Sequence, residues 1–185
     1  YSGDGGAATK GQLAQPKGIA VDAQGNVYIA DTRNFRVRKV SQNGTIATIA
    51  GNGQGGEPSA GERGPATSAA LSHPVGIAVD GKKNVYIADF GSGRVRKVSL
   101  DGTITTFAGS ACRRIPGTPN CETGDGGPAT SAYLHQPHGI ALDRQGNVYI
   151  TDYRDHRVRK VSSDGTITTF AGTGATGYNG DGIPA

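Results

Sequence analysis

The sequence repeats itself three times, and this internal repeat constrains the fold more than any other feature. A segment of the form Pro-x-Gly-Ile-Ala-Val/Leu-Asp begins at Pro16, Pro74 and Pro137. Each copy continues through Asn-Val-Tyr-Ile-Ala/Thr-Asp and Arg-Val-Arg-Lys-Val-Ser, and ends with Gly-Thr-Ile-x-Thr-Ile/Phe-Ala-Gly. The three prolines are 58 and 63 residues apart. A near-constant period of this length is typical of proteins that stack one supersecondary unit several times.

Each repeat predicts four short strands joined by turns. The four segments are rich in Val, Ile, Thr and Tyr, residues that favour strands. Asn43-Gly44 and the Asp-Gly pairs at 101–102 and 164–165 suit the positive φ of tight hairpin turns. Four antiparallel strands in each repeat are typical of a β-propeller blade. In the first repeat the strands are expected at 18–22, 26–31, 36–40 and 45–50.

The residue pattern of the third predicted strand in each repeat favours a blade over a sheet with one solvent-exposed face. Val37 and Val40 are three residues apart, so they point to opposite faces of a regular strand. A blade is covered on both faces by its neighbours, and apolar residues on both faces are then expected. A local bulge at Lys39 is the alternative explanation.

Composition excludes several other classes of protein. Leu, Ile, Val and Phe make up only 18% of the chain, but disorder also requires a high net charge, and the net charge here is +4. The 31 glycines and the scattered β-branched residues disfavour long helices. No apolar run approaches the roughly 18 residues of a membrane-spanning helix, so no membrane contact is expected.

The repeated motifs resemble those of the NHL repeat family. The resemblance rests on Gly-Asp-Gly-Gly-Pro-Ala-Thr-Ser-Ala at 124–132, Pro-x-Gly-Ile-Ala-Val-Asp, Gly-Asn-Val-Tyr-Ile-Ala-Asp and Arg-Val-Arg-Lys-Val, and it covers essentially the whole chain. It implies an all-β β-propeller of four-stranded antiparallel blades, with six blades in a complete ring. Residues 1–185 are then one propeller segment. Its blades are expected at about 16–51, 74–109 and 137–172, with inter-blade loops at 52–73 and 110–136 and blade-connecting terminal segments at 1–15 and 173–185.

The two ends of the chain match each other. Tyr1-Ser2-Gly3-Asp4-Gly5 resembles the segment Tyr178-Asn179-Gly180-Asp181-Gly182. Three blades fill half of a six-bladed ring, and the outer two would expose apolar faces. Either two copies close the ring head to tail as a homodimer, or the chain belongs to a longer protein with further repeats. An open helical stack is the third alternative, if the rotation between copies does not close.

Acidic residues that recur in all three repeats are interpreted as scaffold. Asp22, Asp31 and their equivalents are expected to cap turns by accepting hydrogen bonds from loop amides, and a ring of carboxylates around a cation is the alternative. Asp31 and Arg36 are five residues apart, and an ion pair between them is expected to clamp the hairpin. The acids of the Gly-Asp-Gly segments, Asp4, Asp125 and Asp181, are expected to form turns rather than to bind calcium.

Positions that differ between the repeats are free to carry function, and they gather at one end of the predicted ring. They lie in the loop after the second strand and at the residue after each strand-initial proline, which is expected near the mouth of a central channel. Loops on a rigid scaffold commonly bind partners, so the sequence predicts a non-catalytic scaffold that binds a protein, a peptide or a glycan. The predicted binding face comprises Lys17, Arg33, Asn34, Phe35, Val75, Phe90, His138, Tyr153, Arg154, Asp155 and His156.

An enzymatic function is the first alternative. NHL propellers are similar to the peptidyl-hydroxyglycine lyase propeller, a zinc enzyme with histidines just after the strand-initial proline. His138 matches that position and is the one candidate metal ligand, whereas Lys17 and Val75 do not match. A catalytic zinc site needs three protein ligands. The sequence therefore favours a non-enzymatic function, with no cofactor.

Nucleic-acid binding is the second alternative, and it is less favoured. Nine of the 19 Lys and Arg residues fall in the repeated Arg-Val-Arg-Lys strand, so much of the basic charge belongs to the scaffold. A nucleic-acid interface mixes basic and aromatic side chains in loops. The loops supply only a few: Arg33, Phe35, Tyr153 and Arg154.

The two cysteines, Cys112 and Cys121, both lie in the second long loop. Their spacing does not match a paired Cys-x-x-Cys zinc site. A local disulfide that closes this loop is expected to stabilise it by about 2–3 kcal/mol. Such a bond forms in oxidising compartments, which predicts an extracellular or periplasmic protein.

Overall fold

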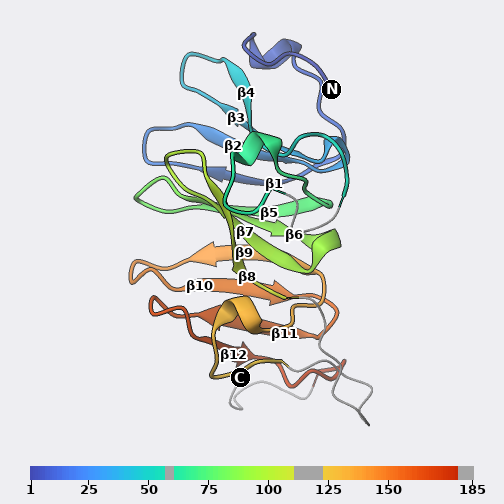
Figure 1. Cartoon of the computed structure of the whole chain (residues 1–185), viewed down its shortest axis with the longest axis vertical. Coiled ribbons are helices and arrows are strands. Elements are labelled where there is room, and N and C mark those ends of the chain that lie inside the picture. Colours follow the sequence, from blue (N-terminus) through green and yellow to red (C-terminus); the bar gives the residue numbers. More distant parts are fainter. Residues whose placement is uncertain (57–60, 111–122, 179–185) are drawn as a thin grey trace.

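The computed structural model describes residues 1–56, 61–110 and 123–178. Three four-stranded antiparallel sheets are stacked along the chain, and in each sheet the strands follow the order of the sequence (Figure 1). The predicted all-β architecture of stacked blades is confirmed, and we call the sheets blades 1, 2 and 3. Blade 1 contains β1 (Pro16–Val21), β2 (Val27–Asp31), β3 (Arg36–Val40) and β4 (Ile46–Ala50). Blade 2 contains β5 (Pro74–Val79), β6 (Val85–Asp89), β7 (Arg94–Val98) and β8 (Ile104–Ala108); blade 3 contains β9 (Pro137–Leu142), β10 (Val148–Asp152), β11 (Arg157–Val161) and β12 (Ile167–Ala171).

The hairpin turns adopt the backbone conformation that their sequences predict. Gly44, Gly102 and Gly165 have φ values of 78°, 82° and 88° between the last two strands of each blade. Such positive values cost little for glycine and strain most other residues. Tight turns at these positions set the antiparallel register of each blade.

Neighbouring blades share apolar cores, as expected when both faces of a sheet are covered. Val37 and Ala50 of blade 1 are fully buried and pack in one cluster with Leu71. The register between β2 and β3 runs without interruption past Lys39, so the bulge considered there is absent. The irregularity lies instead in the pairing of β3 with β4, at Val37–Arg38.

The segments before the three blades, residues 3–16, 61–74 and 124–137, are equivalent in the repeats, and we call them the connecting segments. Each contains a 3-10 turn, η1 (Ala8–Lys10), η3 (Ala66–Ser68) or η5 (Ala129–Ser131). Each also forms an isolated bridge to the residue just before the last strand of its own blade; the bridges join Ala7 to Thr45, Pro65 to Thr103 and Pro128 to Thr166. These bridges cover strand edges that would otherwise be open to pairing with other chains.

The first strands of the three blades, β1, β5 and β9, lie side by side, and we call them the inner strands. A Cβ atom at Gly76 would lie 2.1 Å from the carbonyl oxygen of His138, so the close approach of β5 and β9 requires glycine there.

The remaining 3-10 turns, η2 (Thr32–Asn34) and η4 (Phe90–Ser92), follow the second strands. Across the described residues, the helices are single turns of this kind, and none is long and apolar enough to cross a membrane.

Candidate binding groove on the inner strands

A groove of about 480 Å³ runs across the starts of β1, β5 and β9. The Pro-x-Gly sequence places one variable side chain of each blade there, because the glycine allows the strands to approach closely. The structure thus brings together three predicted site residues from positions far apart in the sequence. The groove is lined by Lys17, Gly18, Val75, Gly76, Ile77, His138, Gly139 and Ile140.

His138 lies between two aromatic rings at the edge of this groove. Its ring centroid is 6.2 Å from that of Phe90 and 6.2 Å from that of Tyr153, within the range of attractive aromatic contacts. The Tyr153 side chain is 60% exposed and His138 is also exposed. We call Phe90, His138 and Tyr153 the aromatic rim, since their rings contact one another in this order along the edge of the groove.

Phe35 has a different partner from the other predicted aromatic residues. Its ring packs edge-to-face against His73, with centroids 5.2 Å apart. His73 was not in the predicted set, but it directly precedes the proline of β5, as Gln15 and Gln136 precede those of β1 and β9. All three have positive φ, between 47° and 65°. The shared position before the proline was the signal that could have identified His73.

Two predicted arginines, one in blade 1 and one in blade 3, are held by equivalent hydrogen bonds. The Nε atom of Arg33 donates to Oε1 of Gln15 at 3.1 Å, and that of Arg154 donates to Oε1 of Gln136 at 3.0 Å. Both arginines remain exposed. Each guanidinium group therefore offers further donors to an anionic or polar ligand.

The other predicted residues of the loops do not enter the groove. Asn34 donates from Nδ2 to the buried Asp31 at 2.8 Å, which fixes it to the scaffold. Asp155 lies 3.1 Å from Nδ1 of His135. His156 lines a separate pocket with Tyr153 on the outer face of blade 3.

The first repeated acid of each blade caps the turn that follows it, as predicted. Oδ1 of Asp22 accepts the backbone N–H of Asn26 at 2.9 Å, and Oδ2 accepts Nδ2 of Asn26 at 2.7 Å and the hydroxyl of Tyr28 at 3.1 Å. Loss of hydration opposes ionisation of Asp22, but these hydrogen bonds outweigh it and lower its pKa to about 2. Burial and the neighbouring carboxylate raise the pKa of Tyr28 to about 12.

The prediction of an ion pair between Asp31 and Arg36 is wrong. Asp31 faces Arg38 instead, at 3.5 Å, and both side chains are fully buried. Asp31 and Arg36 are opposite each other in the ladder, but the diagonal neighbour two residues further on shares the same face and is long enough to reach. Arg36 donates to the backbone carbonyl oxygens of Asn34 and Asn52, both at 3.0 Å.

In each repeat, an acidic residue of the connecting segment contacts the buried arginine at the position of Arg38. Asp4 lies 2.6 Å from Arg38, and the Gly-Glu-Arg-Gly segment of the second repeat places Glu62 3.0 Å from Arg96. Asp125 contacts Arg159 in the third repeat. These acids are spaced like the prolines, by 58 and 63 residues, which was the signal for a shared scaffold role. They fasten the connecting segments to the blades, beyond the turn-forming role expected of them.

The surroundings of the candidate metal ligand are aromatic. His138 contacts Phe90 and Tyr153. Over residues 1–56, 61–110 and 123–178, no group of three or more His, Cys, Asp and Glu side chains is placed to hold a metal ion. Cys112 and Cys121 lie outside the described residues, so their disulfide stays a prediction.

The stacked four-stranded blades and the groove on their inner strands define an NHL-repeat module of the β-propeller class. The family model described as "Teneurin NHL domain" matches residues 1–60, 54–123 and 111–179. The chain therefore belongs to the teneurin NHL domain family, which confirms the predicted NHL relationship.

Curated relatives and solved structures agree with this assignment. The chain is 30% identical to mouse Teneurin-3 over 178 residues and 31% identical to Drosophila melanogaster Teneurin-m over 181 residues. These matches cover 92% and 93% of this chain but 6% of each relative, so the chain spans a small part of their length. A streptogramin B lyase structure is similar in fold, with a TM-score of 0.58 and 17% identity, over 89% of this chain and 43% of that one.

Proposed function

We propose that this chain is a non-catalytic propeller module that binds a protein, peptide or glycan at the inner groove and its aromatic rim. The observation that carries the proposal is the meeting of Lys17, Val75 and His138 in one groove. These side chains differ among three strands whose other residues are nearly identical. The nearly identical residues of these strands are typical of a scaffold. The residues that differ at one shared position are typical of a site that recognises an asymmetric ligand.

The aromatic rim and the two exposed arginines support recognition of a mixed apolar and polar ligand. Exposed aromatic rings and arginines are the side chains that most often dominate binding energy at interfaces. Lys17 adds a positive charge to one end of the groove. Phe35, Asn34, Asp155 and His156 form the periphery of the proposed face.

An extracellular location is part of the proposal. Membership of the teneurin NHL domain family supports it, because the NHL domain of teneurins lies outside the cell in a transmembrane protein. Teneurins are large adhesion proteins, which also supports a role in binding rather than in catalysis. A disulfide between Cys112 and Cys121 would fit this location.

We further propose that the module completes a ring of blades. Residues 1–185 form one propeller segment with blades at 16–51, 74–109 and 137–172, and a second copy or further repeats of a longer chain supply the remaining blades. The three blades match 43% of the streptogramin B lyase chain, and that share is consistent with a larger propeller of which three blades are a part. The finished ring would enclose the groove as an axial channel.

The binding proposal is tested by screening the purified chain against peptide and glycan arrays, followed by titration of the best ligand. Lys17→Glu and His138→Ala should each weaken that ligand at least about tenfold, or roughly 1.4 kcal/mol. Lys82→Glu is the matched control, because Lys82 is exposed on the β5–β6 turn, away from the groove. Equal affinity of all three variants and the unmodified chain would overturn the proposed site.

A further inference from the structure

The segments at the starts of the inner strands, which form the groove, contain no acidic residue. Residues 14–19, 72–77 and 135–140 include neither Asp nor Glu, and their titratable side chains are Lys17, His73, His135 and His138. Lys17 lines the groove and is exposed. A positive charge without a carboxylate in the same segments creates a potential that attracts an anionic ligand.

The turns after the second strands add positive charge at the same end of the blades. The first residue of the first strand pairs with the last residue of the second strand in blades 1 and 3, so each turn lies at the end where the inner strand begins. The exposed Arg33 donates to Gln15 and the exposed Arg154 to Gln136. Each of these glutamines lies two residues before a residue of the groove. The two guanidinium groups are therefore anchored near the groove.

Four acidic residues lie in or beside these turns, and in the described structure each is buried or paired. Asp31, Asp89 and Asp152 are at most 1% exposed. Asp155 lies 3.1 Å from Nδ1 of His135. The acids that cap the turns after the first strands lie at the opposite end of the blades. The accessible charge around the groove is therefore positive.

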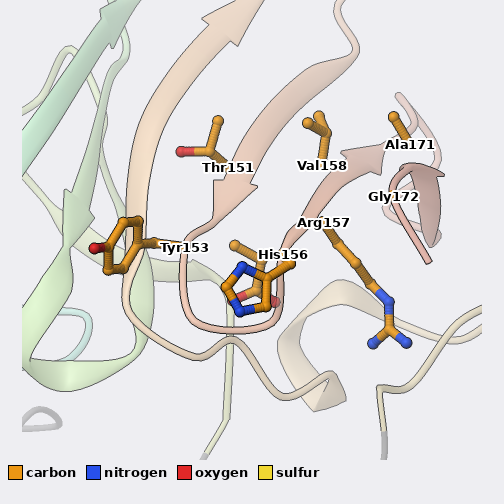
Figure 2. Close-up of a pocket in the computed structure, with 8 residues that line it drawn as sticks. Thr151, Tyr153, His156, Arg157, Val158, Ala171 and Gly172 are labelled. Atoms are coloured by element: carbon orange, nitrogen blue, oxygen red, sulfur yellow. The ribbon is translucent and has the colours of Figure 1, made fainter. Parts of the chain in front are cut away.

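Arg157 does not contribute to this charge. Figure 2 shows that Tyr153 and Arg157 extend to opposite sides of the β10–β11 turn. Arg157 donates to the carbonyl oxygen of Thr173 at 3.1 Å, whereas Tyr153 contacts His138 of the aromatic rim. The turn thus places an aromatic ring, and not this arginine, on the side of the groove.

The floor of the groove is apolar and disfavours a sugar. Lys17 and His138 supply the polar side chains of its lining, and the other lining residues are glycine, valine and isoleucine, of which Val75 and Ile77 are buried. The carbonyl oxygen of Val75 lies against Gly18, where an added Cβ atom would be 2.2 Å away. Sugar hydroxyls placed there would lose water without gaining enough hydrogen-bond partners, which costs free energy. Apolar side chains carry no such cost.

We propose that the inner groove binds an acidic peptide in which carboxylate side chains lie next to apolar ones. The inference rests on the binding function proposed above and names the class of its ligand. One carboxylate of the peptide pairs with Lys17, and others are bound by the guanidinium groups of Arg33 and Arg154, whose planar donors match a carboxylate. The apolar side chains of the peptide pack on the floor of the groove and against the aromatic rim. Charge complementarity selects this peptide over a neutral or basic one.

The test measures the binding of three peptides to the full chain by fluorescence anisotropy. Their sequences are Glu-Leu-Glu-Phe-Glu, Gln-Leu-Gln-Phe-Gln and Lys-Leu-Lys-Phe-Lys, each with a neutral fluorophore at the N-terminus and an amidated C-terminus. The glutamate peptide should bind at least about tenfold more tightly than the glutamine peptide. Its affinity should fall as ionic strength rises, because salt screens exposed charge pairs.

Variants of Lys17 test the charge contact itself. Lys17→Glu should reverse the order, so that the lysine peptide binds more tightly than the glutamate peptide, and Lys17→Gln should reduce the difference between them. Lys82→Glu makes the same change of charge on the exposed β5–β6 turn and should leave the order unchanged. A reversed preference cannot result from misfolding, and circular dichroism checks the fold of each variant.

The outcomes separate this inference from the broader binding proposal. Equal affinities for the three peptides, or a preference that a folded Lys17→Glu leaves unchanged, overturn the ligand class. So does a short single-stranded RNA that displaces the glutamate peptide and binds more tightly. A neutral glycan that loses affinity in His138→Ala but not in Lys17→Glu overturns the ligand class and retains the site. If neither a peptide nor a glycan binds the groove, both proposals are overturned.

Discussion

At the scale of single residues, the innermost glycines set how closely the blades approach. A Cβ atom at Gly76 would lie 2.1 Å from a backbone carbonyl of the next blade, which cannot move away without shifting β9. Among the described residues, no following blade lies against the equivalent Gly139, and the nearest atom to a Cβ there would be the Thr151 hydroxyl oxygen at 3.2 Å. The same glycine of the repeated motif is therefore required where another blade packs against it and is less constrained where none does.

We predict that Gly76→Ala lowers the free energy of unfolding by about 1–3 kcal/mol, because the added methyl group overpacks the β5–β9 contact. Gly139→Ala is the matched control and should cost clearly less in the monomer. Urea denaturation of both variants, monitored by circular dichroism, measures the difference. Equal losses in the two variants would show that the backbone approach does not determine the stability of this contact.

At the scale of elements, the connecting segments hold each blade through one acidic residue and one buried arginine. Glu62 contacts Arg96 and also accepts the backbone N–H of Thr106 at 2.7 Å and its hydroxyl at 2.9 Å. The other repeats place aspartate at this position. The acid therefore bridges the connecting segment to β7 and β8.

Removal of this acid should loosen the second connecting segment. We predict that Glu62→Ala destabilises the chain by about 1.5–3 kcal/mol, the range for hydrogen bonds to charged groups. Glu62→Asp should retain most of the stability, since Asp4 and Asp125 fill this role in the other repeats. Thermal unfolding of both variants measures the effect, and an alanine variant as stable as the aspartate variant would contradict the bridging role.

The sequence predicted the strands and turns well, because the period, the β-branched segments and the turn glycines are local signals. It predicted that Lys17, Val75 and His138 lie near the mouth of a central channel, and the structure places these equivalent residues in one groove. The prediction of the ion-pair partner of Asp31 was wrong. Asp31 contacts Arg38, its diagonal neighbour on the same face of the sheet, and not Arg36, which lies directly opposite it. It did not separate Tyr153 and His156 from the groove residues, because their surroundings depend on which blade follows.

At the scale of the whole molecule, the stack is an arc with two complementary ends. Blade 2 is covered on both faces, whereas blades 1 and 3 each leave one apolar face in water. Exposed apolar residues at the end of a repeat array favour association unless a polar cap covers them. Among the described residues, Ile19, Val21 and Leu13 are exposed at one end of the stack and Phe170 is exposed at the other.

The most direct test of this account is small-angle X-ray scattering from the purified chain across a dilution series. Closure of the ring by a second copy predicts a species of two chains whose profile fits a closed ring of six blades, and which dissociates only on dilution. A profile that fits one arc of three blades at every concentration would contradict it.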